Sequence, residues 1–188
     1  MRAAAGAFDS VVYRLHPLLS GRFSPARFDD TFELAPEEVG LLLEGARWAP
    51  SAGNSQPWAF IVGRRGDDVH RRLVTQLAGS SAVWAGDASL LVANLAHVYV
   101  AGTDWNHSEF SRYDLGQAVA HMTVQAQAMG LFVRQFRAFD RAGIADSFGV
   151  PPHWEVTTMS AVGRAAAGSR RARERWVRRD LLWPPAVQ

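Results

Sequence analysis

The clearest pattern of hydrophobic and polar positions lies in residues 111–129. Apolar side chains recur there at spacings of three and four residues, at Leu115, Val119, Met122, Ala126 and Met129. Residues at this spacing share one face of an α-helix. Gly130 follows directly and is suited to the C-terminal end of a helix. The pattern therefore predicts a long helix with one buried face.

A second segment with helical spacing covers residues 36–49. Its apolar positions are Val39, Leu42, Leu43 and Ala46. Pro36 suits the first helical turn, where a backbone N–H is not needed. The helix is expected to end at Ala49, because Pro50 disfavours helical geometry in the residue before it.

Short apolar runs predict strands at residues 58–62, 88–95, 131–133 and 156–162. Gly63 and Gly163 are expected to end the first and the last of these. Further helices are expected at residues 8–19, 67–78 and 140–148, and loops at 20–35, 50–57 and 101–110. Helices and strands are interleaved without strict alternation, which favours an α+β fold with a sheet between helices.

The composition narrows the chemistry. The 188 residues are 48% hydrophobic, which is typical of a globular chain. No apolar run approaches the ~20 residues that span a bilayer, and the first residues are charged too early for a secretory signal, so a cytoplasmic protein with no membrane partner is expected. The sequence has no Cys, so redox chemistry requires a bound cofactor. It also has no Lys, so a phosphate would be held by Arg or backbone amides.

Several function classes receive little support. The net charge of +2 does not favour nucleic-acid binding. No GxGxxG, Walker or GxSxG motif is present. Asp104, His107 and Glu109 are close in sequence, but they lie in an expected loop and no HxxxH pair occurs, so a metal site is not expected. Trp105, His107, Phe110 and Tyr113 are instead candidates for lining an aromatic substrate pocket.

Two loops carry candidate binding chemistry. The first, residues 50–58 (PSAGNSQPW), has small residues that let a flat ligand approach the backbone, and Asn54 offers both a donor and an acceptor. The second, residues 22–29 (RFSPARFD), has two Arg and one Ser that could hold a phosphate. Taken alone, the first is better explained as an ordinary helix-to-strand turn, and the second could be a solvated basic turn, which is common.

Together these loops resemble the nitroreductase family. The form AP-S-x-x-N-x-QPW is similar to the family's flavin-binding loop, which implies that Pro50, Ser51, Ala52 and Asn54 contact FMN. Residues 22–29 resemble the family pattern R-x-S-x-[RK]-x-F-D, which implies that Arg22, Phe23 and Ser24 bind the FMN phosphate and ribityl chain. The third basic position of that pattern is Ala26 here, and a charge appears one residue later at Arg27.

Three later segments extend the resemblance. The run from Asp114 to Ala118 resembles the family's D-x-G-x-A helix, which forms the dimer interface, and Gln117 is placed among the cofactor contacts. Residues 134–140 resemble the segment whose backbone approaches flavin N5, so Gln135, Phe136, Arg137 and Ala138 are expected there. The family ends with a basic pair, often R-x-R or K-x-R before a Leu, which grips the phosphate. Arg178 or Arg179, before Leu181, is taken as its match.

The resemblance covers roughly residues 18–163, with an Arg-rich arm at 164–188, and implies one nitroreductase-like domain over residues 1–188. It implies a central antiparallel or mixed sheet, a homodimer with FMN at its interface, and ping-pong electron transfer from NAD(P)H to a nitroaromatic, quinone or similar small acceptor. Two alternatives remain open. One is a related flavoenzyme with a tailoring role, such as oxidative dehydrogenation, enone reduction or dehalogenation, and the other is a non-catalytic flavin-binding dimer.

Overall fold

The computed structural model describes residues 14–183 and is built around one four-stranded sheet. The strands are β1 (Trp58–Arg64), β2 (Leu90–His97), β3 (Phe132–Phe136) and β4 (Trp154–Gly163). Their order across the sheet is β1-β2-β4-β3, and all three neighbouring pairs are antiparallel. β3 is therefore an edge strand, a position that matters below.

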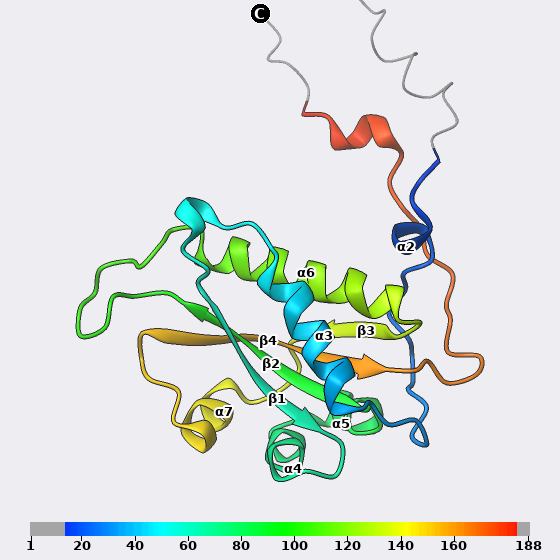
Figure 1. Ribbon diagram of the computed structural model, residues 1–188, viewed down its shortest axis with the longest axis horizontal. Coiled ribbons are helices and arrows are strands. Elements are labelled where there is room, and N and C mark those ends of the chain that lie inside the picture. The colour runs from blue at the N-terminus through cyan, green and yellow to red at the C-terminus, as the bar shows by residue number, and fades with distance from the viewer. Residues whose placement is uncertain (1–13, 184–188) are drawn as a thin grey trace, which may run out of the picture.

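Helices cover both faces of this sheet (Figure 1). One face carries α3 (Pro36–Arg47) and α6 (Ser111–Ala128), and the other carries α4 (Asp68–Thr75), α5 (Gly79–Ala85) and α7 (Arg141–Phe148). The central strand β2 is buried along almost its whole length. Its side chains alternate between the two faces. Leu91 and Ala93 pack in the core between the sheet and α4, α5 and α7, whereas Leu90 and Val92 pack in the core between the sheet and α3 and α6. The expected sheet between helices is confirmed.

The first strand shows why one expected boundary was wrong. Gly63 lies inside β1 rather than ending it. A Cβ atom at Gly63 would lie 2.5 Å from the backbone nitrogen of His70 in α4. The glycine is thus required for close packing of α4 on β1, a long-range contact that the sequence alone does not reveal.

Other boundaries also differ. The expected strand at residues 131–133 is β3, which continues through Phe136, three residues beyond the expected end. Helix α5 was not anticipated, because residues 79–85 have no clear apolar spacing. Helix α3 ends at Arg47, with Trp48 as its C-cap, two residues before the predicted end. Helix α6 matches its prediction within one residue.

The two ends of the described chain lie together. A four-residue helix, α2 (Pro17–Ser20), falls in the region expected to be helical at 8–19, of which residues 8–13 lie outside the described part. Residues 26–29 then pair with residues 164–169 through backbone hydrogen bonds, including Ala26 N to Ser169 O at 3.0 Å. The segment after β4 continues past α2 to the short helix η2 (Arg178–Leu181) (Figure 1). None of the helices in residues 14–183 is long and apolar enough to cross a membrane.

Candidate functional site

The predicted cofactor residues separate into two groups at different ends of α6 (Figure 1). The first group is the Asn54 loop (residues 50–56), which lies at the N-terminal end of the helix. The second contains Arg22, Ser24 and Gln135, which lie toward its C-terminal half. Gly21 is beside Gln127, since a Cβ there would be 3.5 Å from that amide nitrogen. Gln127 lies thirteen residue steps after Asp114 along the helix, which at 1.5 Å per step is about 20 Å.

The Asn54 loop has an unusual backbone. Gly53, Asn54 and Gln56 all have positive φ angles, of 59°, 55° and 46°. Glycine and asparagine tolerate the left-handed region, but glutamine rarely adopts it. Within the loop, Gln56 N donates to the Ser51 hydroxyl at 3.0 Å, which helps to hold this conformation. The side chain of Asn54 is exposed and free to meet a ligand.

Asp114 anchors the same loop to α6. Its buried carboxylate accepts hydrogen bonds from Ala52 N at 3.0 Å and from Gln117 Nε2 at 3.2 Å. The Gln117 amide also donates to the Pro50 carbonyl at 3.4 Å. Gln117 was predicted to contact a cofactor, and it holds the loop that carries Asn54. The anchoring role of Asp114 was missed, although its place in the D-x-G-x-A pattern was the available signal.

The second group lines the Arg22 pocket, a cavity of about 360 Å³. Its walls come from α2, the following loop, α6 and β3. The lining residues are Leu19, Arg22, Ser24, Ala120, Thr123, Val124, Val133 and Gln135. Two hydrogen bonds lie in its walls: Arg22 Nη1 donates to the Ser24 hydroxyl at 3.5 Å, and Gln135 Nε2 donates to the Thr123 hydroxyl at 3.4 Å. The pocket thus combines an apolar floor with a guanidinium, hydroxyls and an amide.

Positive charge collects at one side of this pocket. Burial lowers the pKa of Arg22 from its usual value, and the nearby charges of Arg173 and Arg175 lower it further. Arg173 also donates to the Ser20 carbonyl at 2.7 Å, which ties the C-terminal segment to the pocket. A guanidinium that two others repel in this way would be stabilised by an anion bound beside it.

Arg173 and Arg175 were not the expected pair. Arg178 or Arg179 was expected because both precede Leu181, and they belong to η2. Arg173 and Arg175 have the R-x-R spacing that is frequent in the family's basic pair, and that spacing was the signal that could have found them. Arg173 and Arg175 lie near enough to Arg22 for their charges to lower its pKa.

Some predicted residues serve the core instead. The Phe23 ring is buried, with its centroid 4.3 Å from that of Phe132. The Phe136 ring packs edge-on against Trp84 at 4.9 Å, on the sheet face away from α6. The Phe23 side chain is thus part of the core, whereas that of Phe136 remains partly exposed. Arg137 and Ala138 form the link from β3 to α7, and Ala138 O accepts a hydrogen bond from Ala78 N.

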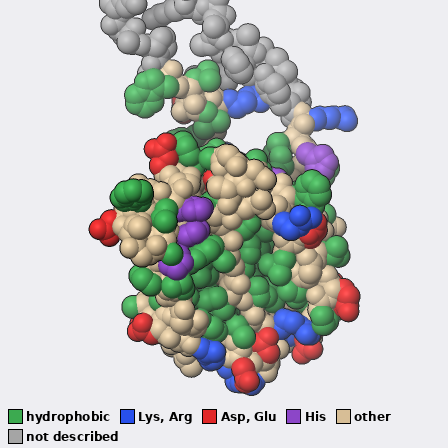
Figure 2. All heavy atoms as spheres, turned by 60° about the vertical axis from the view of Figure 1, so that its left-hand side comes forward, with side chains coloured by type: hydrophobic (Ala, Val, Ile, Leu, Met, Phe, Trp, Pro, Cys, Tyr) green, Lys and Arg blue, Asp and Glu red, His purple; other side chains and the backbone are tan. Residues whose placement is uncertain are grey.

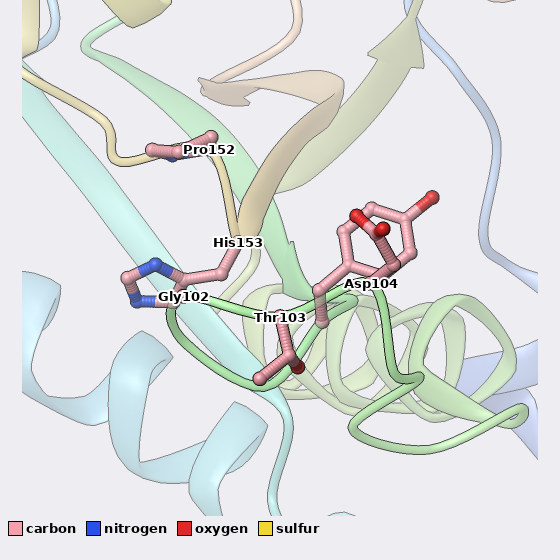
Figure 3. Close-up of a pocket in the computed structure, with 6 residues that line it drawn as sticks. Gly102, Thr103, Asp104, Pro152 and His153 are labelled. Carbon is pink, nitrogen blue, oxygen red and sulfur yellow. The ribbon is translucent and has the colours of Figure 1, made fainter.

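A second pocket, of about 390 Å³, lies between the 99–106 loop and the residues before β4. Figure 3 shows Gly102, Thr103 and Asp104 on one side of it and Pro152 and His153 on the other. Trp105, Phe110 and Tyr113, expected to line an aromatic pocket, are exposed and do not line this one.

His107, the fourth member of that expected pocket, turns toward other histidines. Its ring stacks on His97 with centroids 3.8 Å apart, and His97 stacks in turn on Trp154 at 4.6 Å. His153 approaches His97 edge-on at 5.4 Å. Histidine side chains are seen together on this face in Figure 2. Among residues 14–183, no three His, Cys, Asp or Glu side chains are arranged to hold a metal ion.

Comparison with known proteins identifies the family. Residues 19–164 match the Nitroreductase family. The chain belongs to the nitroreductase family. A Bacillus subtilis relative that carries the provisional name NAD(P)H nitroreductase YdgI is 26% identical over 182 residues, covering 79% of this chain and 87% of that protein.

Solved structures agree with the nitroreductase fold. A crystal structure described as an oxidoreductase containing FMN is 25% identical, with a TM-score of 0.76, and covers 84% of this chain and 80% of that one. A nitroreductase-like protein of Exiguobacterium sibiricum, solved in complex with FMN, has a TM-score of 0.78 at 18% identity, covering 93% of this chain and 99% of that one. The expected fold class and family are thereby confirmed.

Proposed function

We propose that this nitroreductase family member binds FMN and transfers electrons from NAD(P)H to a small acceptor. The observation that carries the proposal is the Arg22 pocket, whose donors suit a phosphorylated and partly apolar ligand. Arg22, Arg173 and Arg175 supply positive charge that no carboxylate of the described residues neutralises in an ion pair, and Ser24 supplies a hydroxyl beside Arg22. Guanidinium groups bind phosphate through charge-assisted hydrogen bonds. The relatives whose descriptions mention FMN or NAD(P)H support the same assignment.

Other residues are our candidates for contacts with the flavin beyond its phosphate. The Thr123 hydroxyl and the Gln135 amide offer polar contacts beyond the phosphate end of the pocket. Asn54, exposed and held in a fixed loop, presents a donor and an acceptor for the ring edge. A bound flavin supplies two-electron transfer at ring atom N5. The backbone of Arg137 and Ala138 is our candidate for the group that orients this atom.

The separation of the two groups along α6 is the basis for proposing a homodimer. In an isologous dimer, the same surface is used by both copies. If two α6 helices pack antiparallel across a two-fold axis, the Asn54 loop of one copy meets the Arg22 pocket of the other. The face of α3 and α6 is suited to such burial, because Leu41 and Trp48 are 51% and 71% exposed beside an apolar groove.

The proposed reaction is ping-pong. NAD(P)H and the acceptor would use the same face of the ring in turn, so neither needs a dinucleotide motif, and the sequence has no GxGxxG. Nitroaromatics and quinones are acceptors that fit an open site of this kind. The chain's own residues then act by binding and orienting, and no side chain is assigned as an acid or base.

The test is the absorption spectrum of the purified full chain, before and after addition of FMN. We expect an oxidised-flavin band near 450 nm that NADH or NADPH bleaches under anaerobic conditions, and that returns when an acceptor is added. A protein that takes up no FMN would refute the proposal. A protein whose bound FMN is never bleached would favour the non-catalytic alternative.

Two variants test the site residues. The double variant Arg22→Ala with Ser24→Ala, and the single variant Asn54→Ala, should each weaken FMN retention without loss of folding. Asn106→Ala, in another exposed loop, is the matched control for Asn54 and should change nothing. Unchanged retention in both test variants would mean that the residues were assigned wrongly.

A further inference from the structure

The family's phosphate-binding pattern has a gap in this chain at Ala26, where a basic side chain is expected. The structure places a different cation against the backbone at that point. Arg134, on the edge strand β3, directs Nη1 to the carbonyl oxygens of Pro25 and Ala26, at 3.3 Å in each case. These are the two residues that follow Ser24.

Arg134 approaches the loop from the opposite side of the sheet to the Arg22 pocket. Successive side chains of a strand point to opposite faces. Val133 and Gln135 line the pocket, and the intervening Arg134 therefore lies on the other face. There its guanidinium stacks 3.7 Å from the centre of the Trp84 ring. Arg134 thus contacts the loop at the sheet edge from the face opposite the Arg22 pocket.

The support for this guanidinium is rigid. Trp84 is buried, and its indole N–H donates to the Ser80 carbonyl at 3.0 Å. Burial lowers the pKa of Arg134, and the nearby charge of Arg171 lowers it further. Among the described residues, Arg134 forms no ion pair with a carboxylate. Its charge is directed to backbone carbonyls and an aromatic face instead.

We propose that Arg134 is a positioning residue for phosphate binding, which holds from β3 the loop that lacks the expected basic residue at Ala26. Arg134 donates hydrogen bonds to the Pro25 and Ala26 carbonyls and so fixes the backbone of this loop. The fixed backbone in turn holds the Ser24 hydroxyl and the Arg22 guanidinium toward the ligand. Arg134 acts through this loop and does not touch the phosphate. The inference rests on the proposed binding of FMN.

The test compares FMN with riboflavin, which has the same ring but no phosphate. Affinities are measured by quenching of flavin fluorescence for the wild-type chain and for Arg134→Met, which keeps a long side chain but removes every donor. We expect the variant to bind FMN about tenfold more weakly, the loss expected from about one charge-assisted hydrogen bond, and to bind riboflavin within twofold of the wild type. Arg134→Lys, which restores the charge, should recover part of the FMN affinity.

Arg72→Met is the matched control. Arg72 also stacks on an aromatic ring, that of Phe148 at 4.1 Å, and it bonds to the Ser147 hydroxyl, but it lies on α4 away from the pocket. Its variant should retain both affinities. If Arg134→Met does not fold, Arg134→Gln, which keeps one donor, is compared with Arg134→Lys instead.

The outcomes separate the two proposals. Equal losses for FMN and riboflavin, or no loss for either, would overturn the role of Arg134. A wild-type chain that binds neither flavin would refute the proposed function itself. A wild-type chain that binds both flavins equally would instead refute the phosphate site.

Discussion

The carboxylate of Asp114 offers the sharpest test of how this structure holds the Asn54 loop. Asp114 is only 1% exposed and accepts one hydrogen bond from Ala52 N and one from Gln117. Replacing it with alanine leaves the Ala52 N–H without this acceptor and removes a negative charge from the first turn of α6. Bonds to charged groups contribute about 1.5–3 kcal/mol, and the helix-dipole term about 0.5 kcal/mol.

The expected loss of unfolding free energy for Asp114→Ala is therefore about 2–3 kcal/mol, because relief of the carboxylate's burial offsets part of the sum. Asp114→Asn keeps a carbonyl acceptor for Ala52 and should lose about 1 kcal/mol. For a chain of this length, the alanine variant should melt roughly 5–10 °C lower.

Urea unfolding followed by far-ultraviolet circular dichroism measures these values, with Asp30→Ala, at an exposed carboxylate, as the control. FMN affinity of the folded alanine variant should also fall, since the Asn54 loop loses its anchor. The reasoning is refuted if Asp114→Ala is within about 0.5 kcal/mol of the Asp30 control.

Two other predictions concern stability. Burial lowers the pKa of His97, and the charges of His107 and His153 lower it further. An imidazole whose pKa is lower in the folded state stabilises the fold above its unfolded pKa of about 6.5 and loses that contribution as pH falls below it. The urea midpoint should thus decrease from pH 7.5 to 5.5, and His97→Phe should reduce the slope; an unchanged midpoint in the wild type would contradict this. Gly63→Ala should lose about 3 kcal/mol, because its Cβ would meet the backbone of α4, whereas Gly40→Ala, with open space around it, should not destabilise the protein; similar unfolding free energies for both would show that α4 is not packed as described.

The sequence predicted those elements whose signal is local. The spacing of Leu115, Val119, Met122 and Ala126 is a property of one segment, and all four side chains are buried on α6 as expected. The apolar run of β2 is equally plain. By contrast, Gly63 was misread as a strand end, because its reason for being glycine is a helix that begins five residues later and folds back on it.

The sequence motifs identified candidate site residues but did not predict how these residues are arranged in space. The motifs named Arg22, Ser24 and Asn54, but they carried no information on which of them lie together in one chain. Leu181 favoured Arg178 or Arg179 as the expected basic pair. The charges near Arg22 are those of Arg173 and Arg175, and their position depends on how residues 164–175 return to the first loop. Arg134 could not have been found from any pattern, since its partners are more than 100 residues away.

The pairing of residues 26–29 with residues 164–169 also has a consequence for biosynthesis. Arg22 leaves the ribosome about 150 residues before Arg173 and Arg175, and contacts of such long separation form late because closing a long loop costs chain entropy. The sheet strands between them can pair while the last segment is still being made. The positively charged pocket is consequently completed only when its C-terminal segment has been synthesised, so a tightly held flavin would mark a chain whose folding has reached its end.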